Sequence, residues 1–323
     1  MRKCLVVALG GVLLCARPAL AEEVNFTPLP EAPLAAPVTA EPPPELSMEE
    51  LQNAAENGHA DAANHLGHIY AKGLGVPRDY AQAMLWSRRA AGLGNIEAQN
   101  RIGAFYAKGL GVKQDDKEAA AWFLGAAEKG HAAAQSNLGS LYAKGQGVEK
   151  DYAKALEWFG KAAAQNNADA FNGLGALYLD GKGVDRNANS AVSWFHKAAE
   201  GGNAAGQNNL GVCFAKGRGV TKDYAEAVRW YRKAAESGNA DAQNNLGNAY
   251  ARAEGVPRDD VKAYMWMDLA AEQGFAQATT DRDALVRAMT PEQIAEAQKL
   301  SREWRPGGKF DDPLLNKRKW GLD

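Results

Sequence analysis

Residues 134–158 read AQSNLGSLYAKGQGVEKDYAKALEW, and their pattern of leucine, glycine, tyrosine and tryptophan returns every 36 residues. A leucine–glycine or isoleucine–glycine pair marks each copy, and the first residues of these pairs are Leu66, Ile102, Leu138, Leu174, Leu210 and Leu246. One tryptophan per copy keeps the same period, at Trp86, Trp122, Trp158, Trp194, Trp230 and Trp266. A fixed period of this length, held without an insertion, predicts a stack of structurally equivalent units.

Each copy is predicted to contain two helices joined by a glycine turn. Within residues 62–70 of the first copy, apolar side chains fall at i, i+4, i+7 and i+8, which is one stripe of an α-helix. Gly73 and Gly75 then end this helix, because glycine readily takes the left-handed conformation that closes a helix C-terminus. Asp79 is a natural N-cap for a second helix, which runs until Gly94. The repeating unit is therefore helix, glycine turn, helix.

Two columns of residues predict how these helices pack. Gly67 and its five equivalents lie inside the first helix, where glycine costs about 1 kcal/mol relative to alanine. A cost repeated in phase predicts a close approach of the first helix to the second, with small residues such as Ala83 facing the glycine. We expect Gly67→Leu to force the two helices apart, and we expect the tryptophan column to fill the space between successive repeats.

The segments that flank the repeats are predicted to be capping helices. Ser47 and Glu50 have the spacing of a capping box that opens a short helix. After Gly274 the 36-residue phase is lost, and helices are expected at about 281–289 and 290–304. The predicted fold class is all-α: an α/α solenoid of six 36-residue helix-turn-helix repeats with N- and C-terminal capping helices.

The chain before the repeats is predicted to be an export signal followed by a tether. Residues 1–21 have a charged start, a short apolar stretch and small residues at the end, as a cleavable signal peptide has. We expect cleavage near Ala21 and a periplasmic or secreted mature protein. Seven prolines in residues 22–46 predict a disordered linker, because proline fixes φ and lacks a backbone donor. The solenoid with its caps would span 47–304, and the tail at 305–323 either folds back, catches a partner or is disordered.

Charge and cysteine content exclude several classes of function. The formal net charge of -2 becomes about -5 when Arg2, Lys3 and Arg17 leave with the signal. A mildly acidic chain has no general attraction for phosphate backbones, so no nucleic-acid partner is expected. Cys213 is the only cysteine outside the signal and cannot form an internal disulfide. No second apolar run is long enough to span a bilayer, so we expect no membrane insertion of the mature chain. We also expect the mature chain to be a monomer.

No arrangement of residues in the sequence predicts catalysis or a bound cofactor. The motifs Ser-x-x-Lys, Gly-x-Ser-x-Gly and His-Glu-x-x-His do not occur. The Gly-x-Gly-Val turns, such as the one that starts at Gly73, lack the lysine of a phosphate-binding loop and recur as turns. His65 and His68, with His59 nearby, would permit a metal site, but only Asp61 could complete the ligand set. We therefore predict no enzyme activity, no cofactor and no metal site.

The repeat consensus Ala-x-Gln-x-x-Leu-Gly-x-x-Tyr-x-x-Gly-x-Gly-Val-x-x-Asp-Tyr-x-x-Ala-x-x-Trp resembles the Sel-like repeat, a branch of the tetratricopeptide-type helical repeats. The copy at 134–158 matches this pattern except that Ala134 and Gln135 are adjacent. The resemblance covers about 47–274, and residues 289–294 look like a terminal helix found in bacterial members. It implies a right-handed superhelix and adaptor roles, which include bridging signalling complexes, regulating membrane-bound sensors and contacting host proteins.

The chain also departs from the family pattern. Some members pair a cysteine in each repeat and are associated with penicillin binding, and this chain lacks such pairs. Repeat four is the least regular copy, with Asn166, Phe171 and Asp180 where the other copies favour glycine, glutamine and lysine.

A ladder of polar residues on the first helix of each repeat is the predicted partner-binding site. Residues at i, i+4 and i+8 share one face of a helix. The predicted site residues in these three columns are Asn64, Asn100, Asn172, Asn208, Asn244, Asn248, Lys72, Lys108, Lys144, Lys216 and Arg252. Asparagine can donate to and accept from a peptide backbone, while lysine can hold a carboxylate. In the alternative interpretation the columns are architectural: the lysines lie at the negative helix end and the asparagines tie turns between repeats.

The predicted function is an exported protein–protein interaction scaffold or adaptor. If the first helices line the concave side, as in tetratricopeptide arrays, they would hold a protein partner or an extended peptide, and one role would be to regulate a membrane-bound complex. A second hypothesis is a cell-wall-related binder or weak β-lactamase-like enzyme, against which the missing cysteine pairs and nucleophile motif argue. A third is a secreted effector that acts on a host protein.

Overall fold

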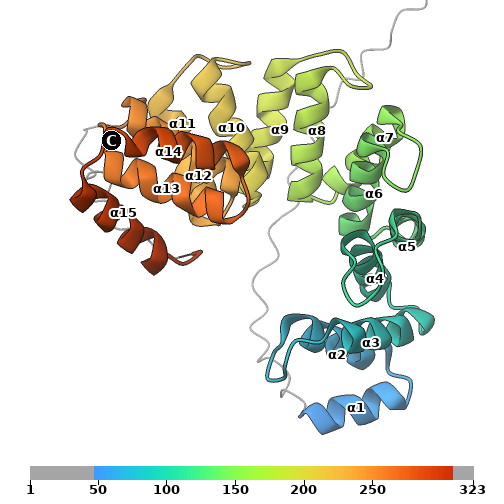
Figure 1. Cartoon of the computed structure of the whole chain (residues 1–323). Helices are drawn as coiled ribbons and strands as arrows, with labels where there is room; N and C mark the ends of the chain where they lie inside the picture. The colour runs from blue at the N-terminus through green and yellow to red at the C-terminus, as the bar shows by residue number, and fades with distance from the viewer. Residues whose placement is uncertain (1–46, 308–323) are drawn as a thin grey trace, which may run out of the picture. The chain divides into compact units, whose positions relative to one another are not determined.

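The computed structural model describes residues 47–307, and this part of the chain consists of helices joined by turns, without a strand (Figure 1). Its fifteen helices are α1 Met48–Glu56, α2 Ala60–Lys72, α3 Tyr80–Gly92, α4 Ile96–Lys108, α5 Asp116–Glu128, α6 Ala132–Lys144, α7 Tyr152–Ala163, α8 Ala168–Asp180, α9 Ala188–Glu200, α10 Ala204–Lys216, α11 Tyr224–Glu236, α12 Ala240–Arg252, α13 Asp260–Glu272, α14 Ala276–Val286 and α15 Pro291–Glu303. The predicted signal peptide (1–21), the predicted linker (22–46) and residues 308–323 of the predicted tail lie outside the described residues.

Local capping explains where the helices begin and end. The Asp79 carboxylate accepts from the backbone N–H groups of Ala81 and Gln82 at 2.8 and 3.0 Å, which starts α3 as expected. The first helix of repeat one ends at Gly73, whose φ of 72° is left-handed. In repeat six Ala253 takes the same position with a φ of 55°, which an L-residue adopts only at a cost.

The helices pack in chain order, so that each helix contacts mainly its neighbours in sequence. The buried side chains form several clusters along the chain instead of one central core. Three of these clusters are built from the second helix of one repeat and the first helix of the next, at α5–α6, α7–α8 and α9–α10. A core assembled from nearest neighbours is that of a solenoid, and the prediction of six two-helix repeats in an all-α solenoid is confirmed.

The tryptophan of each later repeat packs into the junction with the preceding repeat, as predicted. Trp158 and Trp194 pack against the clusters at α5–α6 and α7–α8. Trp230 belongs to the cluster at α9–α10, where its ring meets the His196 ring edge-on at 5.9 Å. Trp266, in the last repeat, is only 1% exposed. The column therefore fills inter-repeat space along the array.

The mid-helix glycines allow the two helices of a repeat to approach closely, as predicted, and an aromatic ring that was not predicted also covers several of them. A Cβ atom on Gly139 would lie 2.9 Å from Cδ1 of Phe159, and one on Gly175 would lie 2.6 Å from Cδ1 of Phe195. These phenylalanines come one residue after the tryptophans. The predicted Ala83 column faces the glycines as well, since the backbone oxygen of Ala83 would lie 3.3 Å from a Cβ atom on Gly67. The reason is geometric: without a Cβ, the first helix presents bare backbone on which an aromatic ring can lie.

The capping helix α1 starts as predicted, because Ser47 and Glu50 form a capping box in which the side chain of each bonds the backbone of the other. The prediction that the repeat phase ends after Gly274 was wrong by one helix. The first helices start every 36 residues, and α14 starts at Ala276, 36 residues after α12, instead of near residue 281. It packs on α13 as the first helix of a seventh unit would.

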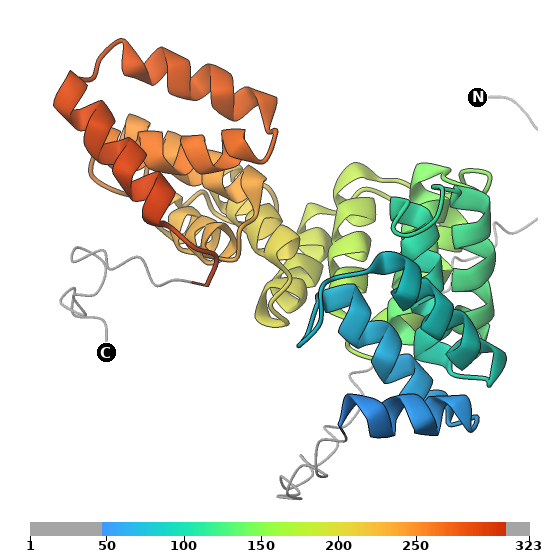
Figure 2. The same ribbon diagram turned by 60° about the horizontal axis from the view of Figure 1, so that its bottom comes forward.

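The last helix starts and ends where the sequence predicted. Thr290 and Gln293 form a second capping box at the start of α15, and its C-cap is Trp304. Both α14 and α15 pack against α13 (Figure 2). The Trp304 ring meets the Trp266 ring edge-on at 6.0 Å, so α15 seals the apolar outer face of the last repeat.

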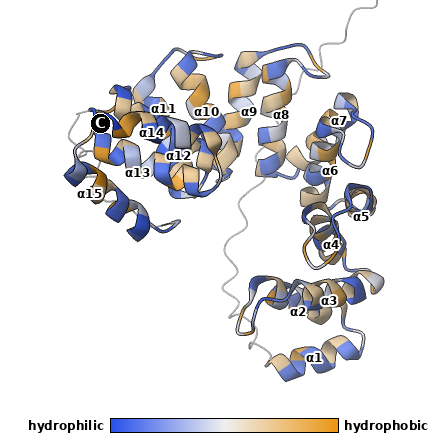
Figure 3. Ribbon diagram, in the orientation of Figure 1, coloured by the Kyte–Doolittle hydropathy of each residue, from blue (hydrophilic) through white to orange (hydrophobic). Residues whose placement is uncertain are grey.

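The helices carry apolar residues on some faces and hydrophilic residues on others (Figure 3). Within residues 47–307 none of them is long and apolar enough to cross a membrane.

Candidate functional site

The asparagines of the predicted ladder join the first helices of successive repeats. In each bond the Nδ2 group of one asparagine donates to the Oδ1 atom of the predicted asparagine 37 residues earlier. The pairs are Asn137–Asn100 at 3.0 Å, Asn209–Asn172 at 2.8 Å and Asn245–Asn208 at 2.9 Å. These amides already hold the array together, so a partner could use only their remaining donors and acceptors.

The two ends of this asparagine column are closed by charged residues. Arg101 donates to both Oδ1 and the backbone oxygen of Asn64, each at 2.8 Å. At the other end the Asp281 carboxylate accepts from Asn244 at 3.3 Å and from Asn248 at 2.9 Å. Burial raises the pKa of Asp281, but the hydrogen bonds from Asn248, Gln277 and Asn244 outweigh it and leave that pKa below its ordinary value.

The five predicted cations form a second column with different surroundings. Each is the last residue of its helix and is exposed: Lys72, Lys108, Lys144, Lys216 and Arg252. Within the described residues, none of them forms an ion pair with a carboxylate. Repeat four has Asp180 at this position, and Lys182 pairs with it at 2.6 Å. The column therefore presents free positive charge at the end of five first helices.

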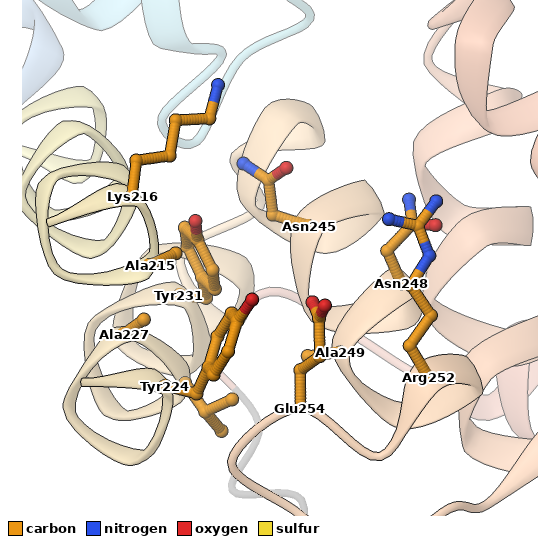
Figure 4. Close-up of a pocket in the computed structure, with 11 residues that line it drawn as sticks. Ala215, Lys216, Tyr224, Ala227, Tyr231, Asn245, Asn248, Ala249, Arg252 and Glu254 are labelled. Carbon is orange, nitrogen blue, oxygen red and sulfur yellow. The ribbon is translucent and has the colours of Figure 1, made fainter. Parts of the chain in front are cut away.

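The structure brings three predicted site residues to one cavity at the junction of repeats five and six. Lys216, Asn248 and Arg252 line a cavity of about 280 Å³ between α10, α11 and α12. Figure 4 shows the Tyr224 and Tyr231 side chains of α11 across from the asparagines of α12. The remaining polar lining comes from Asn245 and Glu254. The other predicted residues, which are the asparagines of the Asn64 column and three lysines of earlier repeats, do not line this cavity.

Sequence reasoning missed both tyrosines and Glu254 in this cavity. Tyr231 is 7% exposed, and burial, followed by the nearby Cys213 and Glu254, raises its pKa, so its hydroxyl keeps its proton. The Lys222 amino group lies 4.4 Å from the centre of the Tyr224 ring, and a hydrogen bond to that tyrosine raises the pKa of Lys222. The feature of the sequence that could have identified this position is that Tyr231 replaces the phenylalanine of repeats two to four.

His131 and Cys213 have structural roles. His131 caps α6, because its Nδ1 atom accepts from the backbone N–H of Ala134 at 3.1 Å, and its Nε2 atom lies 2.6 Å from Glu97. Cys213 is fully buried, and burial raises the pKa of its thiol to about 11, which keeps it unreactive. No cluster of three or more metal-ligating side chains occurs in residues 47–307.

Comparison with known proteins agrees with this architecture. The Sel1 repeat model matches six consecutive segments, at residues 60–95, 96–131, 132–167, 168–203, 204–239 and 240–275. A Sel1 repeat protein from Oxalobacter formigenes is 34% identical, with a TM-score of 0.58 over 76% of this chain and 99% of that one. A protective antigen with an SLR fold from uropathogenic Escherichia coli is 27% identical over 79% of this chain and 86% of that one, with a TM-score of 0.43. None of the curated proteins matches significantly.

Six stacked two-helix units define a helical-repeat protein. The chain belongs to the Sel1 repeat family, because the matched segments cover well over half of it. Sel1 repeats mediate protein interactions, and the family is typically non-enzymatic. The resemblance inferred from the repeat consensus is therefore confirmed.

Proposed function

We propose that the protein is an exported scaffold that holds an acidic, extended segment of a partner protein along its column of cations. The observation that carries this proposal is that Lys72, Lys108, Lys144, Lys216 and Arg252 are exposed and unpaired with carboxylates within the described chain. A lysine at a helix C-terminus also interacts favourably with the partial negative charge of the helix dipole. This interaction leaves its ammonium group free to bind a ligand. The asparagine column keeps successive cations in register.

A peptide partner fits the column better than a compact ligand does. The cations occur once per repeat along successive first helices, so a ligand must be long to meet more than one of them. An extended chain places alternate side chains on one side and can present several carboxylates in series. Complementary charge of this kind favours fast and specific association.

The test is binding of an amidated peptide of alternating glutamate and alanine, measured by fluorescence anisotropy. We expect the triple variant Lys108→Gln, Lys144→Gln, Lys216→Gln to bind about tenfold more weakly, because each exposed ion pair contributes about 0.5 kcal/mol. The matched control replaces three exposed lysines outside the column, Lys113, Lys117 and Lys150, with glutamine. An equal loss in the control would show that net charge alone acts, and equal binding of a peptide with glutamine for glutamate would show that the carboxylates are not recognised. Either result would overturn the proposal.

Export is the second part of the proposal and rests on residues 1–21. Expression of the full chain with its own N-terminus should yield a processed protein outside the cytoplasm that begins near Glu22. A full-length product that stays in the cytoplasm would contradict export but would leave the binding result unaffected. An exported scaffold could serve a membrane-bound complex, for which the acidic partner segment would be the point of attachment.

A further inference from the structure

The junction of repeats five and six is more polar than the equivalent junctions of the array. Tyr231 occupies a column whose other members are Ser87, Phe123, Phe159, Phe195 and Met267. Asn248 occupies a column whose other members are His68, Ala104, Ser140, Ala176 and Val212. Of these junctions, this one alone combines a tyrosine in the first column with an asparagine in the second. Both residues line the cavity of about 280 Å³, which two cations of the column also line.

The cavity offers two free hydrogen-bond donors that a carboxylate could use. The Tyr231 hydroxyl is neutral and makes no hydrogen bond within the described residues. Asn245 uses one amide hydrogen to reach Asn208, which leaves its second hydrogen available. Asn248 uses its amide nitrogen for Asn244 and Asp281, so it helps to shape the wall.

The charges around the cavity favour an anion. Glu254 lies close enough to Lys222 to raise its pKa, after the larger effect of the Tyr224 hydrogen bond, so this carboxylate already has a cation nearby. Lys216 and Arg252 have no ion-pair partner among the described residues. The positive charge of Arg252 acts on Asp281, but the two do not form an ion pair. Two cations and a neutral hydroxyl donor are therefore left for a ligand.

A carboxylate side chain fits this environment better than a chain terminus does. Lys216 and Arg252 continue a column that also holds Lys72, Lys108 and Lys144. A peptide has only one terminal carboxylate, whereas aspartate or glutamate side chains can supply one anion for each cation along the column. The pocket at this junction would then fix the position of one acidic side chain of the peptide.

We infer that the cavity between α10, α11 and α12 is a specificity pocket that takes an aspartate or glutamate side chain of the bound partner. In it Lys216 and Arg252 attract the carboxylate, and the Tyr231 hydroxyl donates a hydrogen bond to it. This inference rests on the proposed function, since the rest of the peptide would lie along the cation column. It makes Tyr231, on the second helix of repeat five, the residue that distinguishes this junction.

The test is Tyr231→Phe, which removes one hydroxyl and gives repeat five the phenylalanine that repeats two to four have. This variant should therefore fold normally, which circular dichroism and thermal unfolding verify. We expect it to bind the amidated glutamate–alanine peptide about tenfold more weakly than the unmodified protein does. Tyr142→Phe, which removes a tyrosine hydroxyl outside the cavity, should bind like the unmodified protein. The side-chain amide NMR signals of Asn245 should shift when the glutamate peptide is added.

The outcomes separate the pocket from the scaffold. If the unmodified protein does not bind the glutamate peptide, the proposed function fails and the pocket fails with it. If the column variants weaken binding but Tyr231→Phe does not, the scaffold stands and the pocket is overturned. A glutamine peptide with a free C-terminal carboxylate is the last probe. If it binds as well as the amidated glutamate peptide, the assignment to an acidic side chain is wrong.

Discussion

At the scale of single residues, the closest packing within a repeat lies between a helix glycine and the ring that covers it. Gly139→Ala would place a Cβ atom 2.9 Å from Cδ1 of Phe159, closer than carbon atoms approach without strain. We expect a net loss of about 1–3 kcal/mol in the free energy of unfolding, although alanine favours helices by about 1 kcal/mol. Urea unfolding followed by circular dichroism measures the change.

The control for this variant lies in α7 of the same repeat. Gly160 is exposed, and a Cβ atom there would meet nothing within 4 Å, so Gly160→Ala should stabilise the protein by about 0.5–1 kcal/mol. The two substitutions are chemically identical and are expected to have opposite signs. Should Gly139→Ala also gain stability, the contact with Phe159 would not be the reason for glycine at that position.

The period of the sequence predicted where the tight contact occurs and that the Ala83 column takes part in it, but not the second column that covers the glycines. Gly67 and its equivalents stand out, because glycine inside a helix is unusual. The column that covers them is less regular, since it changes from serine to phenylalanine, tyrosine and methionine along the chain. The architectural alternative included asparagine ties between repeats, but their partners were not predicted, because these lie in the neighbouring column and meet only when two repeats are stacked.

At the scale of helices, α14 shows how packing can outlast the sequence pattern. Arg282 stands where Leu246 stands in repeat six, so the apolar stripe that marks the earlier first helices is interrupted. The helix nevertheless docks on α13, and Arg282 pairs with Asp268 of α13 at 2.8 Å. Asp281 extends the asparagine column by one step. The surface of the preceding repeat therefore positions α14. A search of the sequence for identical residues at the 36-residue period does not detect this effect.

The link between repeats two and three predicts a dependence of stability on pH. Because His131 Nδ1 accepts from the backbone, its Nε2 atom carries the hydrogen that it donates to Glu97 at 2.6 Å. This hydrogen bond lowers the pKa of Glu97 below its ordinary value of 4.5. A carboxyl with a lower pKa in the folded state stabilises the fold above its unfolded pKa and loses that contribution as the pH falls through the folded pKa.

We therefore expect Glu97→Gln to reduce the loss of stability between pH 7 and acid pH below 4. The effect should be at most about 1 kcal/mol, because the Glu97 side chain is half exposed and the pair is screened by solvent. Urea unfolding at a series of pH values measures it. Glu149→Gln, which removes an exposed turn carboxylate, is the control. Identical acid profiles for Glu97→Gln and the unmodified protein would mean that the His131 contact does not lower the pKa of Glu97.

At the scale of the whole molecule, the number and order of the repeats could be predicted and the place of the binding pocket could not. A repeat with a fixed period determines a nearest-neighbour stack, because every unit meets the same surfaces. The pocket depends on a departure from that period, which is the change from phenylalanine to tyrosine at position 231. Such a change can be interpreted only when the residues around it in the structure are known. The cation column was identified as a candidate because it follows the period.

Unequal junctions should make the array unfold in parts. The clusters at α7–α8 and at α9–α10 have six buried residues each, whereas the cluster around α12 has fourteen. The α7–α8 cluster also includes the first helix of the irregular repeat four. Leu174→Ala removes a buried side chain from this cluster and should cost about 2–5 kcal/mol at that junction. Since each repeat contacts only its neighbours, we expect hydrogen exchange to accelerate in α7 and α8 while α11 to α13 stay protected.

The same deletion at Leu246 provides the comparison. Leu246 is fully buried in the larger cluster, so Leu246→Ala removes the same atoms from a junction with more support on both sides. We expect urea unfolding of this variant to remain a single transition, and that of Leu174→Ala to separate into two, because the weakened junction uncouples the two halves of the array. A uniform rise in exchange along the whole array of Leu174→Ala would show that the repeats fold as one cooperative unit, and that the small cluster is not its weakest point.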